Sequence, residues 1–289
     1  MSSIQLSELE YDVSENSPRS KLDLAGAIPF FLIHIAAIVG AFFVEWTTEA
    51  IAIGVVSYVM RMFGVTAGYH RYFSHRTFKM SRFAQFWMAF LAQSSAQRGA
   101  LWWAAHHRHH HKYSDAPDDV HSPVQRGFWY SHVGWIFSDN SETHTHRIKD
   151  LMKFPELVWL DRYHHVPAII VALASYYLAG LPGLIIGFFL STVALWHATF
   201  TINSLSHVWG TRRYETTDDS RNNPILAFIT LGEGWHNNHH HYQASVRQGF
   251  AWWEIDLTYI ALRAMAVLGL VSDIREPPER IMSGLKSRR

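Results

Sequence analysis

The chain has 289 residues, of which 48% are hydrophobic and only 17% are charged, well below the roughly 25% of an average soluble domain. This composition argues against a disordered chain, and the balance of 25 basic against 24 acidic residues argues against a nucleic-acid scaffold. The absence of cysteine excludes disulfides, thiolate nucleophiles and cysteine-based metal sites, whereas 20 histidines are more than chance would supply.

Four apolar stretches are long enough to cross a membrane as helices. A helix rises about 1.5 Å per residue, so about 20 apolar residues span a hydrocarbon core of about 30 Å. The stretches are residues 24–44, 50–69, 166–181 and 184–203. The sequence therefore predicts an all-α integral membrane protein with four transmembrane helices. The alternative is a soluble all-α protein that buries these helices.

The distribution of Lys and Arg predicts how the helices are oriented. The short connections 45–49 and 180–183 contain neither residue, whereas residues 70–165 contain 12 of them and residues 204–289 contain 10. Because cytoplasmic loops carry the excess of Lys and Arg, we expect both long segments and both chain termini to face the cytoplasm. The helices then form two hairpins, with most of the remaining chain on one side of the membrane.

The chain divides into three parts. Residues 1–23 form a polar N-terminal tail, residues 24–272 the membrane domain and residues 273–289 a basic C-terminal tail. Within the domain, residues 83–103 and 252–271 mix apolar side chains with polar or charged ones. They are expected to lie on the bilayer surface as helices, or else to pack as ordinary core helices of the cytoplasmic part.

Three histidine clusters and one shorter motif lie on the predicted cytoplasmic side. The clusters are His70-Arg-Tyr-Phe-Ser-His75, His106-His-Arg-His-His-His111 and His236-Asn-Asn-His-His-His241, and the motif is Asn203-Ser-Leu-Ser-His207. Imidazole is a good ligand for iron, copper, zinc and nickel. Because such side chains rarely gather beside a membrane without a function, the sequence predicts a metal site here.

Helical spacing selects the histidines that point together. Residues three and four apart share a helix face, and the second and third clusters both contain the pattern His-x-x-His-His. His70 and His75 are five apart, about 140° around an α-helix, so they either serve different ions or straddle a helix end. With His207, the selected histidines are too many for one ion and about right for two. They are His70, His75, His107, His110, His111, His207, His236, His239 and His240. The other cluster members, His106, His109 and His241, have the wrong phase and are expected to face solvent or to support the ligands from behind.

Carboxylates in the pattern that binds two metal ions directly are missing, because carboxylate di-iron sites use two Glu-x-x-His motifs and this sequence has one, Glu233–His236. Two ions held by imidazole alone leave a positive charge that nearby acids have to offset. The candidates are Asp115, Asp118 and Asp119, just after the second cluster, and Glu233, three residues before His236. If these acids do not offset the charge of the metal ions, they are solvated loop residues or helix caps.

These motifs resemble those of the membrane fatty acid desaturases, specifically the Δ9 acyl-CoA (stearoyl-CoA) desaturase branch. His70–His75 matches the family's HxxxxH box and His107–His111 its HxxHH box. Residues 232–240 look like its GEGxHNxHH box, and Asn203–His207 resembles its NSxxH motif. The resemblance covers about residues 25–260.

The resemblance implies a fold, a metal centre and a reaction. The family has four transmembrane helices topped by a cytosolic helical cap. Its nine histidines, which match the nine selected above, hold two iron ions, and Asn203 matches a position that reaches one iron through water. The iron centre itself carries out the O2-dependent removal of two hydrogens from a saturated acyl-CoA, which gives a cis double bond. The electrons come from a separate donor, such as ferredoxin or cytochrome b5 with its reductase.

The segment before the second histidine box departs from the family pattern. Residues 97–103 replace acidic and polar residues of the animal enzymes, which leaves coenzyme A, acyl carrier protein or an intact lipid open as the acyl carrier. The reaction needs one methylene to be positioned and water to be excluded, so we expect an apolar tunnel from the cap toward the membrane. Trp102 and Trp103 are candidate wall residues, or else interfacial anchors.

Two other functions compete with desaturation. Fatty acid and alkane hydroxylases use a similar histidine-box di-iron site. A different position of the substrate at that site would change the reaction from desaturation to hydroxylation. A metal transporter or store without enzymatic activity is the second alternative. Transporters place their ligands near the middle of the bilayer, whereas the histidine clusters here lie outside the predicted spans.

Overall fold

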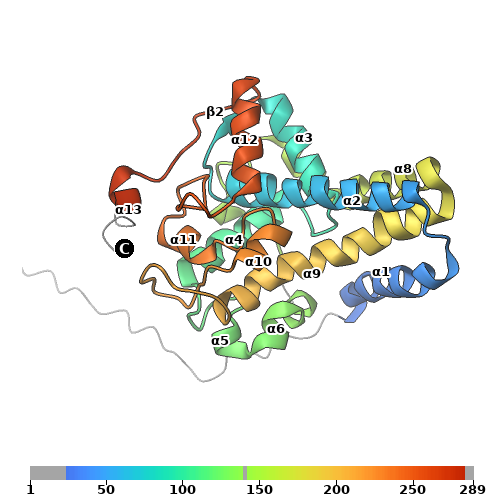
Figure 1. Cartoon of the computed structure of the whole chain (residues 1–289), viewed down its shortest axis with the longest axis horizontal. Helices are drawn as coiled ribbons and strands as arrows, with labels where there is room; N and C mark the ends of the chain where they lie inside the picture. The colour runs from blue at the N-terminus through green and yellow to red at the C-terminus, as the bar shows by residue number, and fades with distance from the viewer. Residues whose placement is uncertain (1–23, 139–141, 284–289) are drawn as a thin grey trace, which may run out of the picture.

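The computed structural model describes residues 24–138 and 142–283, which form a helical molecule with long helices at one end (Figure 1). The predicted N-terminal tail, residues 1–23, lies outside the described residues, as do residues 284–289 of the predicted C-terminal tail.

The long helices cover the four apolar stretches of the sequence. α1 (Leu24–Phe43) is joined by a short loop to α2 (Thr48–Phe63), which continues directly as the π-helix η1 (Gly64–Ser74). α8 (Val166–Pro182) is followed by the π-helix η4 (Gly183–Leu190) and by α9 (Ser191–Asn203), which leads into the short η5 (Leu205–His207).

The chain reverses direction between α8 and η4. Ala179 and Gly180 leave helical geometry, and Gly180 has a φ of 60° that favours glycine. A Cβ on Gly183 would lie 2.1 Å from the carbonyl oxygen of Ser175, so glycine is needed for η4 to pack directly against α8. Two helical segments of the described chain are long and apolar enough to cross a membrane, Thr48–Ser74 with 27 residues and Val166–His207 with 42. The second contains both arms of this hairpin, and Ala27–Phe43 is a shorter apolar helix.

The other end of the molecule, which we call the cap, consists of shorter elements. Its longer helices are α3 (Arg82–Gln93), α4 (Ala100–Tyr113), α7 (Pro155–Arg162) and α12 (Leu257–Val267). Its shorter helices are α5 (Pro123–Arg126), α6 (Phe128–His132), η2 (Gly134–Phe137), η3 (Thr145–Arg147), α10 (Pro224–Ile229), α11 (His236–His241) and α13 (Glu279–Ser283). The strands β1 (Lys79–Met80) and β2 (Val271–Ser272) pair in antiparallel fashion.

The predicted surface helix at residues 83–103 is two helices in the structure. α3 ends at Gln93 and α4 begins at Ala100, and between them Ala96 and Arg98 have positive φ angles. In Figure 1, α3 and α12 stand across the direction of α2. Both helices are capped by side chains, since Ser81 accepts a hydrogen bond from Ala84 N and Asp256 accepts one from Tyr259 N.

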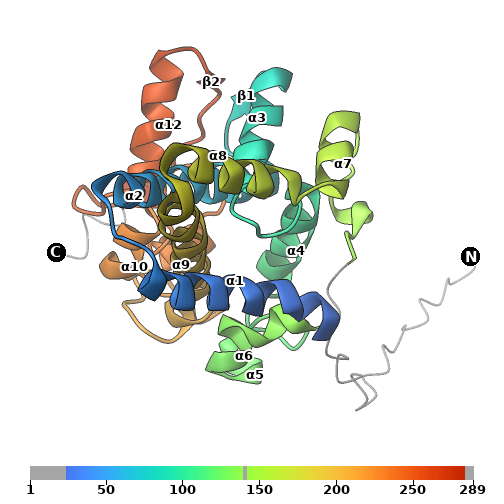
Figure 2. The same ribbon diagram turned by 90° about the vertical axis from the view of Figure 1, so that its right-hand side faces the viewer.

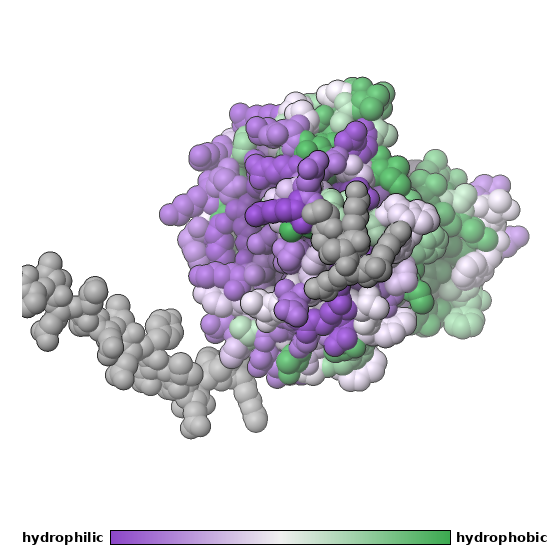
Figure 3. Space-filling model, turned by 60° about the vertical axis from the view of Figure 1, so that its left-hand side comes forward, coloured by the Kyte–Doolittle hydropathy of each residue, from purple (hydrophilic) through white to green (hydrophobic). Residues whose placement is uncertain are grey.

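Apolar and polar surfaces are segregated. Many large apolar side chains of α1, α2 and α8 are exposed, among them Phe42 at 83% and Leu178 at 73%. The space-filling view shows hydrophobic residues gathered at the end with the long helices and hydrophilic residues over the cap (Figure 3). Side chains of η1 and α4, such as Tyr69 and Leu101, are buried where the two ends meet.

Candidate metal centre

The nine histidines that the spacing selects come together in two groups. The first group has five members whose ring nitrogens lie within 4.8 Å of one another: His70, His75, His107, His111 and His239. The Nε2 atom of His239 lies 2.9 Å from that of His70 and 3.0 Å from that of His111. Since a metal binds imidazole nitrogen at about 2.0–2.1 Å, the group has the size of a site for one ion.

The second group has four members, and its ring nitrogens also lie within 4.8 Å of one another: His110, His207, His236 and His240. The Nε2 atoms of His207 and His236 are 3.1 Å apart. His207 belongs to η5, directly after α9, so the end of a long apolar helix contributes to the same group as the cap.

Two helices of the cap, α4 and α11, contribute to both groups. In α4, His107 and His111 belong to the five-histidine group and His110 belongs to the four-histidine group. In α11, His239 belongs to the first group. His236 and His240, which are four residues apart from each other, belong to the second. Residues four apart therefore share a group and the residue three apart serves the other, so each His-x-x-His-His pattern contacts both groups.

His70 and His75 lie in one group because the helix that carries them is not an α-helix. η1 is a π-helix, in which hydrogen bonds connect residues five apart. The amide of His75 donates to the carbonyl of His70 at 3.2 Å, and the two rings are 4.8 Å apart. Of the two arrangements open at the level of sequence, the pair straddling a helix end is the one observed, and assignment to different groups is wrong.

Aspartates hold three of the four histidines in the second group. The pairs are His110 with Asp119 at 3.0 Å, His207 with Asp115 at 2.8 Å and His240 with Asp218 at 2.6 Å, each through Nδ1 of the ring. Burial opposes the ionisation of Asp115, but the hydrogen bond from His207 outweighs it and lowers the pKa of Asp115 to about 2. A carboxylate on Nδ1 fixes the tautomer that turns Nε2 toward a metal and strengthens the ring as a ligand.

The five-histidine group is contacted by one carboxylate among the residues that the structure describes. Glu233 pairs with Nδ1 of His70, and its Oε1 accepts hydrogen bonds from Arg71 at 2.9 and 3.1 Å. Burial opposes the ionisation of Glu233, but the charges of His70 and Arg71 lower its pKa to about 2. Arg71 also donates to Asp256 at 2.9 and 3.0 Å, so the site is tied to the residue that caps α12.

Asp118 does not make the contact expected of it. Its side chain is exposed, and its backbone carbonyl pairs with Nε2 of His109 at 2.9 Å. The adjacent Asp119 is buried instead and bonds to His110, because the turn after α4 points the next side chain inward. Asp115 and Glu233 lie where the sequence analysis expected them.

The cluster histidines with the wrong helical phase lie outside both groups. His106 is buried against Trp102, with ring centroids 4.2 Å apart. His241 is exposed and stacks on Tyr214 at 4.0 Å. Helical phase therefore separates the histidines of the two groups from their neighbours in the sequence.

A small cavity of about 40 Å³ lies between the two groups. His70 and His107 of the first group line it together with His110 and His236 of the second. Asn203, at the end of α9, lines the same cavity. A small molecule there would touch both groups at once.

A second cavity, of about 730 Å³, adjoins the first. Trp103, His107 and Asn203 line both cavities. Trp102 and Trp103 thus lie along the larger cavity, where the sequence analysis expected tunnel walls. Its other lining residues are mostly apolar or aromatic, which suits a hydrocarbon chain.

Several residues around the groups carried no sequence signal that we recognised. Asp218 lies in the loop before α10, far along the chain from the acids that follow α4. Gln248 donates to Glu233 at 3.0 Å from another loop. His121 differs in that its place two residues after Asp119 in the sequence could have singled it out. It is buried, and its ring centroid lies 4.4 Å from that of His110. Burial lowers the pKa of His121 to about 3.

The two neighbouring aspartates give a matched test of the outer hydrogen bonds. We expect Asp119→Asn to lower metal affinity by about 10–100-fold, because the amide no longer polarises His110 as a carboxylate does. Asp118→Asn should leave it unchanged, since that side chain is exposed. Competition with a chelator, read by elemental analysis of the protein, measures both. Equal losses in the two variants would contradict the assignment of Asp119.

The donor set fits metal ions that bind imidazole. Nε2 of His240 is buried without a hydrogen-bond partner, while Nδ1 of the same ring is held by Asp218. A buried polar atom without a partner is costly, and a metal ion would satisfy it. Nitrogen-only ligands without thiolate suit iron, zinc, copper or nickel.

Comparison with known proteins identifies the family. The sequence profile described as fatty acid desaturase matches residues 45–271. The sn-2 palmitoyl-lipid 9-desaturase of a Nostoc species is 35% identical over 279 residues, which cover 93% of this chain and 95% of that protein. The sn-1 stearoyl-lipid 9-desaturase of a Synechocystis species is 33% identical, over 93% of this chain and 86% of that protein.

A plant enzyme with a different substrate by name is about equally similar. Icosanoyl-CoA 5-desaturase of Limnanthes douglasii is 33% identical over 92% of this chain and 76% of that protein. The family profile covers most of the chain, and these relatives cover nearly all of it. The chain therefore belongs to the fatty acid desaturase family, whose members are oxidoreductases that act on fatty acyl chains, as its histidine boxes predict.

Proposed function

We propose that this protein is an O2-dependent fatty acyl desaturase with two iron ions, and that it introduces a cis double bond at the Δ9 position of a saturated acyl chain. The observation that carries the proposal is the juxtaposition of two histidine groups with a small cavity that both share and a long apolar cavity beside it. The names of the Nostoc and Synechocystis relatives support the Δ9 position.

In this proposal each histidine group holds one iron ion. The five-histidine group binds one, and the four-histidine group binds the other with Asn203 acting through a water molecule. Iron supplies the oxidising power that an unactivated C–H bond requires, which no side chain provides. Each turnover takes two hydrogens from the chain, two electrons and two protons, and reduces O2 to two water molecules.

The side chains of the protein position the substrate and the ligands. Trp102, Trp103 and Phe200 line the apolar cavity and exclude water from it. Asp115, which is hydrogen-bonded to His207, orients that ring and offsets positive charge. The electrons come from a separate donor, such as ferredoxin or cytochrome b5 with its reductase.

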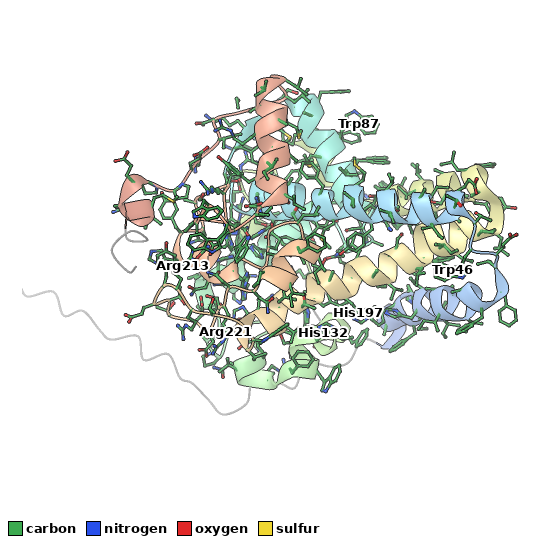
Figure 4. The ribbon with its side chains drawn as sticks, in the orientation of Figure 1. Trp46, Trp87, His132, His197, Arg213 and Arg221 are labelled. Carbon is green, nitrogen blue, oxygen red and sulfur yellow. The ribbon has the colours of Figure 1, made fainter. Side chains whose placement is uncertain are left out.

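We propose a multi-pass membrane protein with four transmembrane helices and a cytosolic cap. α1, α2 with η1, α8, and η4 with α9 are the four spans, and the two hairpins turn on the far side of the membrane. Exposed Trp46 lies in the α1–α2 loop, and exposed Trp87 lies on α3 of the cap (Figure 4). Tryptophans at both ends of the spans are typical of the two membrane interfaces. With the cap on the Lys- and Arg-rich side, both termini and the metal centre are cytoplasmic.

Of the three acyl carriers left open by the sequence, coenzyme A and an intact lipid are the two that occur in the names of the relatives. The resemblance to the Δ9 acyl-CoA branch favours acyl-CoA, and the Limnanthes relative acts on an acyl-CoA by name. The two cyanobacterial relatives act on lipid-bound chains by name.

A fatty-acid profile tests the proposed function. We expect a host that lacks this desaturase to gain cis-Δ9 monounsaturated chains when it expresses the protein, and to gain none with His107→Ala. Gas chromatography–mass spectrometry of total lipids detects the products and the position of the bond. Hydroxy acids in their place would favour the hydroxylase alternative. Iron-loaded protein that produces neither with several electron donors, and that exchanges zinc freely, would favour the metal store.

A further inference from the structure

The larger cavity begins in the cap and extends along the long helices. One face of η4 and α9 forms its floor, with Leu184, Phe188, Trp196, Phe200 and Asn203 spaced at three, four, seven or eight residues. At the α-helical rise of 1.5 Å per residue, Leu184 and Asn203 would lie about 28 Å apart along the helix, and the π-helical turn of η4 shortens this slightly. This length is close to the hydrocarbon thickness of a bilayer, about 30 Å. The cavity therefore reaches from the histidine groups deep into the membrane-spanning part.

α1 and α8 form the two walls of the cavity. Figure 2 shows them on opposite sides of α9, which is seen nearly end-on between them. Each wall contributes residues from one helical face, including Phe30 and Ile33 of α1. Ile169 and Leu173 of α8 line the cavity and are each 51% exposed, and Tyr176 is 48% exposed. Because lining residues of α8 are half exposed, the cavity opens along the flank of the helices.

Polar contacts hold α1 in place beside the opening. The ring nitrogens of His34 in α1 and His197 in α9 are 3.1 Å apart, and those of His197 and His132 in α6 are 3.0 Å apart. His132 and His197 lie close together where α6 meets α9 (Figure 4). Phe30 stacks on Trp196 with a centroid distance of 5.3 Å. These contacts fix α1 to the floor of the cavity, so the opening toward α8 is part of the packed structure.

We propose that the substrate enters this opening sideways from the bilayer, as an acyl chain still esterified to a membrane glycerolipid. The inference rests on the proposed function and deepens it by naming the acyl carrier. An opening on the flank of membrane-spanning helices admits molecules that are already dissolved in the bilayer. The acyl chain slides between α1 and α8 onto α9, and its reacting methylenes reach the end of the larger cavity at Asn203.

The charges along the cavity agree with a lipid rather than coenzyme A. Among the lining residues that the structure describes, Arg98 is the one side chain with a permanent positive charge, and lysine is absent. Coenzyme A carries several phosphates, which proteins bind with clusters of Arg and Lys. A glycerolipid leaves its headgroup in the interface, where His164 and His165 lie at the beginning of α8 and Arg98, from the α3–α4 loop, lies near His164.

Photolabelling tests the entry path without relying on catalysis. The full-length, iron-loaded protein is placed in phosphatidylcholine vesicles in which a few lipids carry a diazirine at the end of a palmitoyl chain. After illumination, we expect label on the α8 face around Ala172, which lines the cavity. Ala172→Trp should reduce this label about tenfold or more, as expected when a binding site is lost. Leu178→Trp, on an exposed part of α8 outside the cavity, should not. Uniform labelling of α8 that Ala172→Trp leaves unchanged would overturn the proposal.

Crosslinking tests the same path on protein that is already folded. The chain has no cysteine, so Ile33→Cys combined with Leu173→Cys gives one defined pair across the opening. A cleavable bismaleimide that joins the pair should stop desaturation of the vesicle lipid, and cleavage of the linker should restore it. The reference is the same double variant treated with the linker already cleaved, which attaches to each cysteine without joining the two helices. Full activity of the crosslinked protein would exclude entry between α1 and α8.

The two proposals can fail separately. If the lipid probe labels the α8 face of the cavity but no double bond forms in the lipid, the entry path is supported and the proposed desaturation is not. Desaturation of palmitoyl-CoA, with lipid-bound chains left saturated, would support desaturation and overturn the lipid carrier.

Discussion

His239→Ala is expected to abolish desaturation and to remove most of the iron from the purified protein. Nε2 of His239 lies 2.9 Å from that of His70 and 3.0 Å from that of His111, so its loss opens the five-histidine group. Replacing residues that only hydrogen-bond to a ligand typically costs 10–100-fold in affinity or activity. Removing the ligand itself should therefore cost more than about 100-fold in turnover.

The matched control for this variant is His241→Ala, two residues further along the same helix. His241 is exposed, stacks on Tyr214 and belongs to neither group. It should keep most of its activity and iron. Turnover on vesicle lipid and iron content by elemental analysis measure both effects. Similar losses in the two variants would show that the grouping of the histidines is wrong.

Arg71→Ala is expected to destabilise the protein by about 3–5 kcal/mol, which is the usual cost of leaving a buried ion partner unpaired. Arg71 is 1% exposed and donates hydrogen bonds to both Glu233 and Asp256. Its loss leaves two buried carboxylates without their cation. The melting of detergent-solubilised protein, with metal removed from all variants, separates this effect from any loss of metal binding.

An exposed ion pair provides the control for Arg71. Arg263 and Glu276 are 2.7 Å apart at the surface, and Arg263→Ala should cost less than about 1 kcal/mol. The double variant Arg71→Ala/Asp256→Asn should lose less than the sum of its single changes, because removing the charge of Asp256 relieves part of the penalty. If Arg71→Ala melted like Arg263→Ala, the buried network would not contribute to stability.

The helices and the histidines were predictable because their signals are local. Apolar runs of about 20 residues predict α1 and α9 by length alone. Spacing on one helix face separated His107 and His111 from His106 and His109, since that argument needs only the helical repeat. The family follows from the order of the boxes along the chain.

Other features depend on contacts between distant segments or on small departures from regular geometry. The sequence shows no feature that distinguishes a π-helix from an α-helix at residues 64–74, so His70 and His75 could not be assigned to one group. Asp218 reaches His240 from a loop with no periodic pattern. The choice between Asp118 and Asp119 depends on how one turn after α4 directs successive side chains.

The unequal number of carboxylates around the two groups has a consequence for assembly. Asp115, Asp119 and Asp218 surround the four-histidine group, whereas the five-histidine group has Glu233, whose charge is shared with Arg71. A divalent cation entering the empty protein therefore meets a more negative field in the group with fewer nitrogens. Electrostatics thus favours filling the two positions in a fixed order, and a half-loaded molecule is one defined species rather than a mixture of two.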